Sequence, residues 1–99
     1  MLINKNSFNT NDIVSMKLVN GDELVAKMVL ETADSYLLSR PCTVIPSAQG
    51  MGLVQSMFTA DVAKDISINK QHVMMAAPSI AAMEKHYLET TSGIALITR

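Results

Sequence analysis

The sequence has no tryptophan, a single cysteine and few aromatic side chains, which make up 4% of its 99 residues. The lone thiol of Cys42 excludes an intramolecular disulfide and a cysteine-rich zinc site, because both need several thiols. The longest apolar runs, at residues 73–78 and 94–97, fall far short of the roughly 20 residues that cross a bilayer. Residues 1–6 also lack the apolar run of a secretory signal. We therefore expect a chain without a membrane partner, located in the cytoplasm.

Neither sign of charge dominates, because 8 Lys and Arg oppose 9 Asp and Glu, for a formal net charge of −1. A protein that coats polyanions needs a strong basic excess, so general nucleic-acid coating is disfavoured while a local basic site stays open. The apolar fraction of 48% is typical of one globular domain. The chain also has 8 methionines. They favour an adaptable core, with a buried subunit contact as the alternative.

The residues that carry enzyme chemistry are present but scattered along the chain. His72, His86 and Cys42 could ligate zinc together with a carboxylate, but they lack the spacing of paired ligands. The glycine-bearing stretch at 49–52 has no phosphate-binding or dinucleotide-binding fingerprint. No ordered Ser/His/Asp or Cys/His arrangement occurs. We therefore predict a protein that is not an enzyme and that holds no metal and no cofactor.

Alternation of apolar and polar residues predicts a β-hairpin in the first third of the chain. Residues 14–18 alternate with period two, which places their apolar members on one face of a strand. The alternation resumes over residues 24–31. Between the two runs lies Asn20-Gly21, the dipeptide that most readily adopts the positive φ of a tight hairpin turn. The preceding residues 1–11 are polar and rich in asparagine, and we interpret them as an N-terminal arm.

More short strands are expected beyond this hairpin. Arg40-Pro41 should bend the strand that contains it, because proline cannot donate to a ladder. A loop at 46–50 and a polar turn at 69–72 separate the later strands. Closely spaced short strands of this kind are typical of a small barrel or sandwich. The predicted strands cover residues 36–45, 53–58, 66–68 and 73–76.

The pattern changes from period two to a helical period near the C-terminus. Apolar residues spaced from Ile80 onward along one face predict a helix over 80–90, with Ser79 as its N-cap and Gly93 at its C-cap. The apolar tail at 94–97 is expected to add a strand to a sheet edge, in this chain or in a partner. The predicted organisation is an arm at 1–11, a barrel at 12–78, and a C-terminal helix and apolar tail at 79–99.

Two segments within residues 12–78 carry a family resemblance. The first has an apolar strand, a glycine and a small residue at a fixed spacing, and it resembles the first signature segment of Sm-like (LSm) proteins. The second, at 66–76, resembles the closing strand-turn-strand of that family, and Lys70 stands where its bacterial host-factor-type members place a lysine. Within the family, the chain is most similar to Sm-like proteins of T4-type phages of marine bacteria. The residues of the first segment are Leu18, Gly21, Leu24, Ala26 and Met28.

The resemblance implies a mainly β fold, a small and strongly bent five-stranded Sm-like β-barrel to which the C-terminal helix is added. It also implies a homo-oligomer, a ring in which edge strands of neighbouring subunits pair. Single-stranded RNA would then bind at the turns that face the pore. Tyr36 or Leu37 would stack on a base, Asn69 would contact a base edge, and Lys70 would contact a phosphate.

Two alternatives remain open at this point. Tyr36 could pack in the core while Asn69 and Lys70 form an ordinary solvated turn, because a fold does not carry its function with it. The protein would then be a non-catalytic protein-interaction or assembly component, related to a phage particle or a phage–host complex, with no RNA binding. If the chain is phage-encoded, its expected location is the host cytoplasm.

Overall fold

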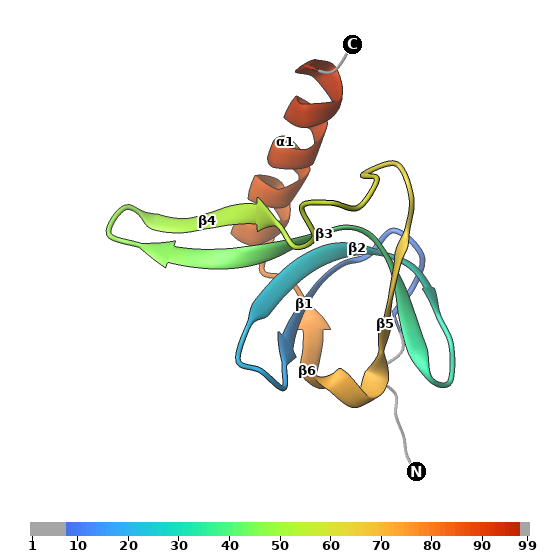
Figure 1. The fold of residues 1–99 in the computed structure, drawn as a ribbon. Helices are drawn as coiled ribbons and strands as arrows, with labels where there is room; N and C mark the ends of the chain where they lie inside the picture. Colours follow the sequence, from blue (N-terminus) through green and yellow to red (C-terminus); the bar gives the residue numbers. More distant parts are fainter. Residues whose placement is uncertain (1–7, 98–99) are drawn as a thin grey trace.

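A computed structural model describes residues 8–97 of the chain, and its side chains as far as residue 92. The chain forms one antiparallel sheet of six strands followed by a helix, which confirms the predicted mainly β class with a C-terminal helix (Figure 1). The elements in chain order are β1 (Ile13–Leu18), β2 (Glu23–Glu31), β3 (Ser35–Ser47), β4 (Gly50–Gln55), β5 (Ile66–Asn69), the 3₁₀ helix η1 (Lys70–His72), β6 (Val73–Pro78) and α1 (Ala81–Ile97).

The order of strands in the sheet is β4-β3-β2-β1-β6, and β5 also pairs with β3. β3 is 13 residues long, so its first part pairs with β5 and its last part with β4. β4 and β5 both pair with β3, and residues 56–65, which lie outside the sheet, separate them into two strands. The sheet therefore has six strands rather than the predicted five. The sheet is not closed. Its hydrogen-bonded order ends at β4 and at β6.

The predicted hairpin turn at Asn20-Gly21 is confirmed. Gly21 has φ of +98°, a value that glycine adopts without a steric penalty. Its amide donates to the Leu18 carbonyl at 2.9 Å. The Asn20 side-chain oxygen accepts from the Asp22 amide at 3.0 Å. These bonds within the turn join β1 to β2 and set the register in which Met16 faces Leu24.

β3 bends where the sequence places Arg40-Pro41. Arg40 has a left-handed backbone with φ of 49°, and the pairing of β2 with β3 shifts in register between Val25 and Lys27. Pro41 has no N–H to donate, so the ladder cannot continue regularly at this point. The predicted bend is therefore confirmed, and β3 continues through it as one strand.

The second hairpin differs from its predicted boundaries. The apolar residues predict a strand over 53–58, whereas β4 spans 50–55. The reason is a tight turn in which Ser47 pairs with Gly50. The Ser47 hydroxyl accepts from the Gln49 amide at 3.3 Å and donates to the Gly50 carbonyl at 3.0 Å. The strand begins directly after this turn, at Gly50. It ends at Gln55, three residues before the predicted end.

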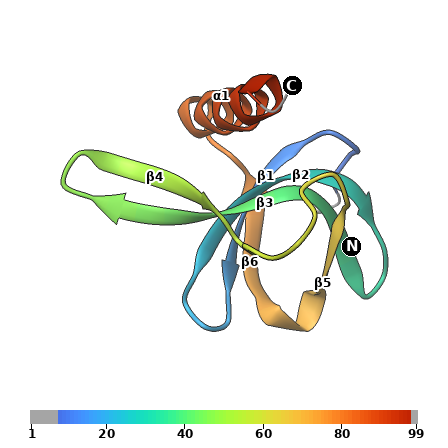
Figure 2. The same cartoon turned by 45° about the horizontal axis from the view of Figure 1, so that its top comes forward.

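Buried side chains lie on both faces of the central part of the sheet. Neighbouring residues such as Ile13 and Val14 belong to different clusters, because successive side chains of a strand point to opposite sides. Tyr87 of α1 is 1% exposed and completes the smaller cluster, and α1 lies over that side of the sheet (Figure 2). The larger cluster is formed by Val14, Met16, Leu24, Ala26, Met28, Tyr36 and Leu38, and the smaller one by Ile13, Val25, Cys42 and Tyr87.

The C-terminal helix begins within one residue of its predicted start, but it is longer than predicted and its predicted C-terminal end is wrong. α1 runs from Ala81 to Ile97, so Gly93 lies inside it and residues 94–97 are helical rather than a strand. A glycine inside a helix costs only about 1 kcal/mol, which the surrounding helical turns offset. Ser79, the predicted N-cap, lies two residues before the first residue of α1, and its hydroxyl bonds to that of Ser15 at 2.7 Å. No helix within residues 8–97 combines the length and apolar character needed to cross a membrane.

Candidate functional site

The structure brings three of the predicted RNA-binding residues together at the start of β3 and at η1. Tyr36 lies in the part of β3 that pairs with β5, and Asn69 and Lys70 follow directly at the end of β5. The Lys70 amide donates to the Asp34 carbonyl at 2.8 Å. The Asn69 side-chain oxygen accepts from the Gln71 amide at 2.8 Å. The Asn69 side chain therefore caps η1, and the turn is held against β3.

Tyr36 belongs to the hydrophobic core and is only 9% exposed. Its ring meets the ring of Phe8 in a tilted arrangement, with centroids 6.2 Å apart. The Lys70 ammonium lies 5.0 Å from the centre of the Tyr36 ring. A cation over an aromatic face is attracted by the negative face of the ring. Tyr36 thus packs in the core, as the alternative interpretation expects, and positions Lys70 at the same time.

Lys70 forms an ion pair with Glu31, the last residue of β2. The Lys70 Nζ lies 2.8 Å from the Glu31 Oε2, and both side chains are partly buried. The other oxygen of Glu31 accepts from the Phe8 amide at 2.9 Å. Burial acts to raise the pKa of Glu31, but the two hydrogen bonds and the charge of Lys70 together hold it below its ordinary value. Lys70 is therefore a neutralised cation in this structure.

Glu31 and Phe8 are the members of this cluster that the sequence patterns did not indicate. Glu31 is 39 residues from Lys70 along the chain, and Phe8 is 23 residues from Glu31. The sequence offered one signal for this contact: Phe8 is an apolar residue within the polar arm, so it is the residue expected to attach the arm to the core. The arm continues along β2, where the Asn11 amide donates to the Met28 carbonyl at 2.7 Å. Residues 1–7 of the predicted arm lie outside the described part.

Leu37 is separated from the other candidate residues. It follows Tyr36 in β3, so its side chain points to the opposite face of the sheet. It is half-buried and lies opposite Ser67 of β5 and Leu30 of β2. Of the two side chains expected to stack on a base, Tyr36 is the one that lies beside Lys70.

The residues considered for zinc do not form a cluster. Among the described residues, no group of three or more His, Cys, Asp and Glu side chains lies close enough together to hold a metal. Cys42 is buried, and burial raises the pKa of its thiol. A raised pKa keeps the thiol protonated, and a protonated thiol is a poor metal ligand and a poor nucleophile.

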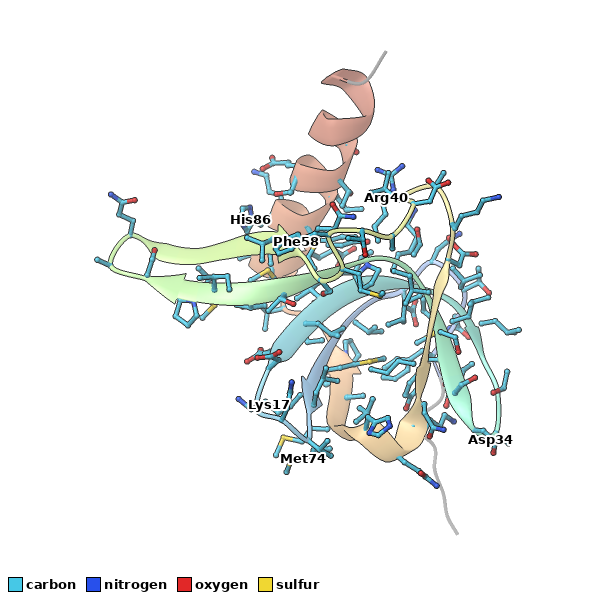
Figure 3. The ribbon with its side chains drawn as sticks, in the orientation of Figure 1. Lys17, Asp34, Arg40, Phe58, Met74 and His86 are labelled. Atoms are coloured by element: carbon cyan, nitrogen blue, oxygen red, sulfur yellow. The ribbon has the colours of Figure 1, made fainter. Side chains whose placement is uncertain are left out.

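The two strands that end the sheet order carry exposed apolar side chains on both of their faces. On β4, Met51 and Val54 are exposed, and the β3–β4 hairpin projects from the rest of the sheet (Figure 1). On β6, Met74 and Met75 are 62% and 67% exposed. Figure 3 shows Met74 on the outside of β6, pointing away from the body. Exposed apolar residues are ordinary on a protein surface and also occur elsewhere in the described chain, as at Phe58 and Ile80. An edge strand that carries them can pair with another strand and bury them.

The fold and the site define a mainly β domain with an apolar edge strand at each end of its sheet and a lysine-bearing turn beside its core. Comparison of the chain with protein-family models gives no match, and comparison with curated proteins gives none either. Any function must therefore be argued from the geometry of these edges and of this turn.

Proposed function

We propose that the protein is a non-catalytic assembly module whose copies join through the edge strands β4 and β6. The carrying observation is that the sheet order ends in these two strands of six residues each, both with exposed apolar side chains. An edge strand presents unpaired N–H and C=O groups that readily pair with another strand. Pairing between copies satisfies these groups and removes the exposed methionines from water.

The proposed contact is heterologous, because β4 of one copy meets β6 of the next. Each copy then keeps one edge of each kind, and such a chain of contacts closes into a ring when the rotation between copies permits. The Sm-like resemblance supports a ring, since edge-strand pairing is what that family's fold implies. We also propose that the strongly bent sheet is an Sm-like fold.

The test places charges on the proposed edges and measures the mass of the assembly by light scattering after gel filtration. Wild-type protein should elute at a multiple of 10.7 kDa. Two lysines on β4 (Met51→Lys with Val54→Lys), or two glutamates on β6 (Met74→Glu with Met75→Glu), should each shift the protein toward monomer. Burying unpaired charges in an interface is costly. Each pair puts one charge on each face of its strand.

A variant that carries all four substitutions tests whether β4 of one copy pairs with β6 of the next. Opposite charges then face each other across the β4–β6 contact, so assembly should return in part and become sensitive to salt. Val19→Lys is the matched control, because Val19 is 56% exposed but lies in the β1–β2 turn rather than on an edge. A wild-type protein of monomer mass at micromolar concentrations would contradict the assembly. If the variant with all four substitutions stayed monomeric, that result would contradict the pairing of β4 with β6.

A second candidate function is binding of single-stranded RNA at the η1 turn. It is favoured by the placement of the Lys70 ammonium over Tyr36 with Asn69 next to it, since repetition of this turn around a ring would converge several such lysines. The ion pair with Glu31 opposes it, because the lysine charge is already neutralised.

Two substitutions separate the contribution of the Lys70 charge to RNA binding from its neutralisation by Glu31: Glu31→Gln and Lys70→Ala. Glu31→Gln should strengthen binding of a short oligonucleotide severalfold by releasing the charge of Lys70. Lys70→Ala should weaken binding and lower the salt slope by about one for each phosphate that the lysine no longer neutralises. Fluorescence anisotropy over a salt series measures both, with Lys85→Ala on the exposed side of α1 as the control. Absence of wild-type binding at low salt would rule out this second function.

A further inference from the structure

A hollow lies where the bend of β3, the segment at 56–65 and α1 come together. Its walls come from three parts of the chain that are far apart in sequence, and Figure 3 shows Arg40 between α1 and that segment. Its cavity volume is about 60 Å³, and it opens to solvent at its mouth. Its apolar walls are Pro41, Cys42, Leu53, Ala60, Val62 and Ile66.

The polar groups around this hollow are unequal in charge. Arg40 and Lys64 contribute two cations, and Asp61 contributes one carboxylate, which leaves one positive charge in excess. Arg40 is held in place by α1, because its Nη1 donates to the Thr91 carbonyl at 3.3 Å. The Asp61 carboxylate already accepts from the Ala63 amide at 2.9 Å. An apolar hollow with a few polar groups is the common form of a small-molecule site.

We propose that this hollow binds a short-chain apolar monocarboxylate. The hydrocarbon chain would lie against Leu53, Val62 and Ile66, which removes apolar surface from water. The carboxylate would lie beside Arg40 and Lys64, where the excess positive charge favours an anion. Leu53 belongs to β4, so the hollow adjoins one of the proposed assembly edges, but neither Met51 nor Val54 lines it and it lies apart from the η1 turn.

Hexanoate titrated into the ¹³C-labelled protein tests this site through the methyl resonances of Leu53, Val62 and Ile66. Saturable shifts of these methyls are expected with hexanoate, with weaker binding of hexanol and still weaker binding of hexylammonium. Lys64→Gln should weaken hexanoate binding about fivefold, within the range of a partly exposed ion pair. It should leave hexanol binding unchanged. Lys85→Gln on the exposed side of α1 is the control and should leave both unchanged.

A second variant tests the hollow without altering charge. Ala60→Leu would extend a larger side chain toward the space that the ligand chain occupies, so it should abolish hexanoate shifts while the rest of the spectrum stays that of the folded protein. Ala60 lies in an irregular segment and is half-buried, so the segment can accommodate the larger side chain. The proposal is overturned by an absence of saturable methyl shifts with hexanoate. Equal binding of hexylammonium, or full hexanoate binding by Ala60→Leu, also overturns it.

Discussion

Replacing Tyr87 with phenylalanine is expected to lower the free energy of unfolding by about 1–3 kcal/mol. The Tyr87 hydroxyl donates to the Ser39 carbonyl at 2.8 Å and accepts from the Lys27 amide at 3.2 Å. It also lies 3.2 Å from the Arg40 carbonyl. All three backbone groups stand where the β2–β3 ladder is interrupted. Phenylalanine would leave these partly buried groups without their protein partner, and the lost hydrogen bonds lower the stability of the folded state.

Tyr87→Ala should have a larger effect, about 3–5 kcal/mol, because it also empties the space under α1. Among the side chains of α1 as far as residue 92, that of Tyr87 is the most completely buried, and it fills the smaller core cluster. Without its ring, α1 loses its most buried contact with the sheet among the described side chains, while Met83 and the Arg40–Thr91 bond still hold it. Hydrogen exchange should therefore show loss of protection in α1 before loss of protection in the sheet.

Urea unfolding followed by circular dichroism measures both Tyr87 variants. Tyr36→Phe is the matched control, since the Tyr36 ring keeps its contacts with Phe8 and Lys70 when only the hydroxyl is removed. The hydroxyl of Tyr87 has a pKa raised to about 12, chiefly by burial, so it stays protonated and the Tyr87→Phe effect should be constant from about pH 6 to about pH 8. A Tyr87→Phe variant as stable as the Tyr36→Phe variant would contradict the anchoring role.

Replacing Met28 with alanine is the second substitution with a large expected effect, a loss of about 2–5 kcal/mol in the free energy of unfolding. Met28 is 0% exposed and lies in the larger core cluster, between the part of β3 that carries Leu38 and the arm that carries Phe8. Alanine removes most of the side chain and leaves a cavity that the bent sheet can only partly close.

Met57→Ala is the control for this substitution, because Met57 is 48% exposed in the segment between β4 and β5. Its removal should change the unfolding free energy by less than about 0.5 kcal/mol. The comparison separates the two interpretations of the high methionine content, since Met16 and Met28 fill the core while Met51, Met74 and Met75 lie on the sheet edges. Equal effects of Met28→Ala and Met57→Ala on thermal unfolding would contradict the core role of Met28.

Only part of the candidate site could be predicted from the sequence. Lys70 and Asn69 were named as candidates through the Sm-like resemblance of the polar turn that carries them, and the structure keeps that turn as η1. Glu31 and Phe8 were missed because ion pairs and ring contacts across the sheet depend on register rather than on neighbours in sequence. The choice between Tyr36 and Leu37 depended on which face of β3 turns inward.

Local patterns were sufficient for the β1–β2 hairpin, the bend at Pro41 and the β5–η1–β6 segment, because each depends on the φ preference of a few adjacent residues or on period-two alternation. The C-terminal end of α1, the docking of Tyr87 and the open sheet order required the folded chain. Tyr87, for example, docks through groups brought together across a long stretch of sequence, its hydroxyl and the Ser39 carbonyl. Local preferences of a few tenths of a kcal/mol give way to such contacts, because burial and satisfied hydrogen bonds contribute more.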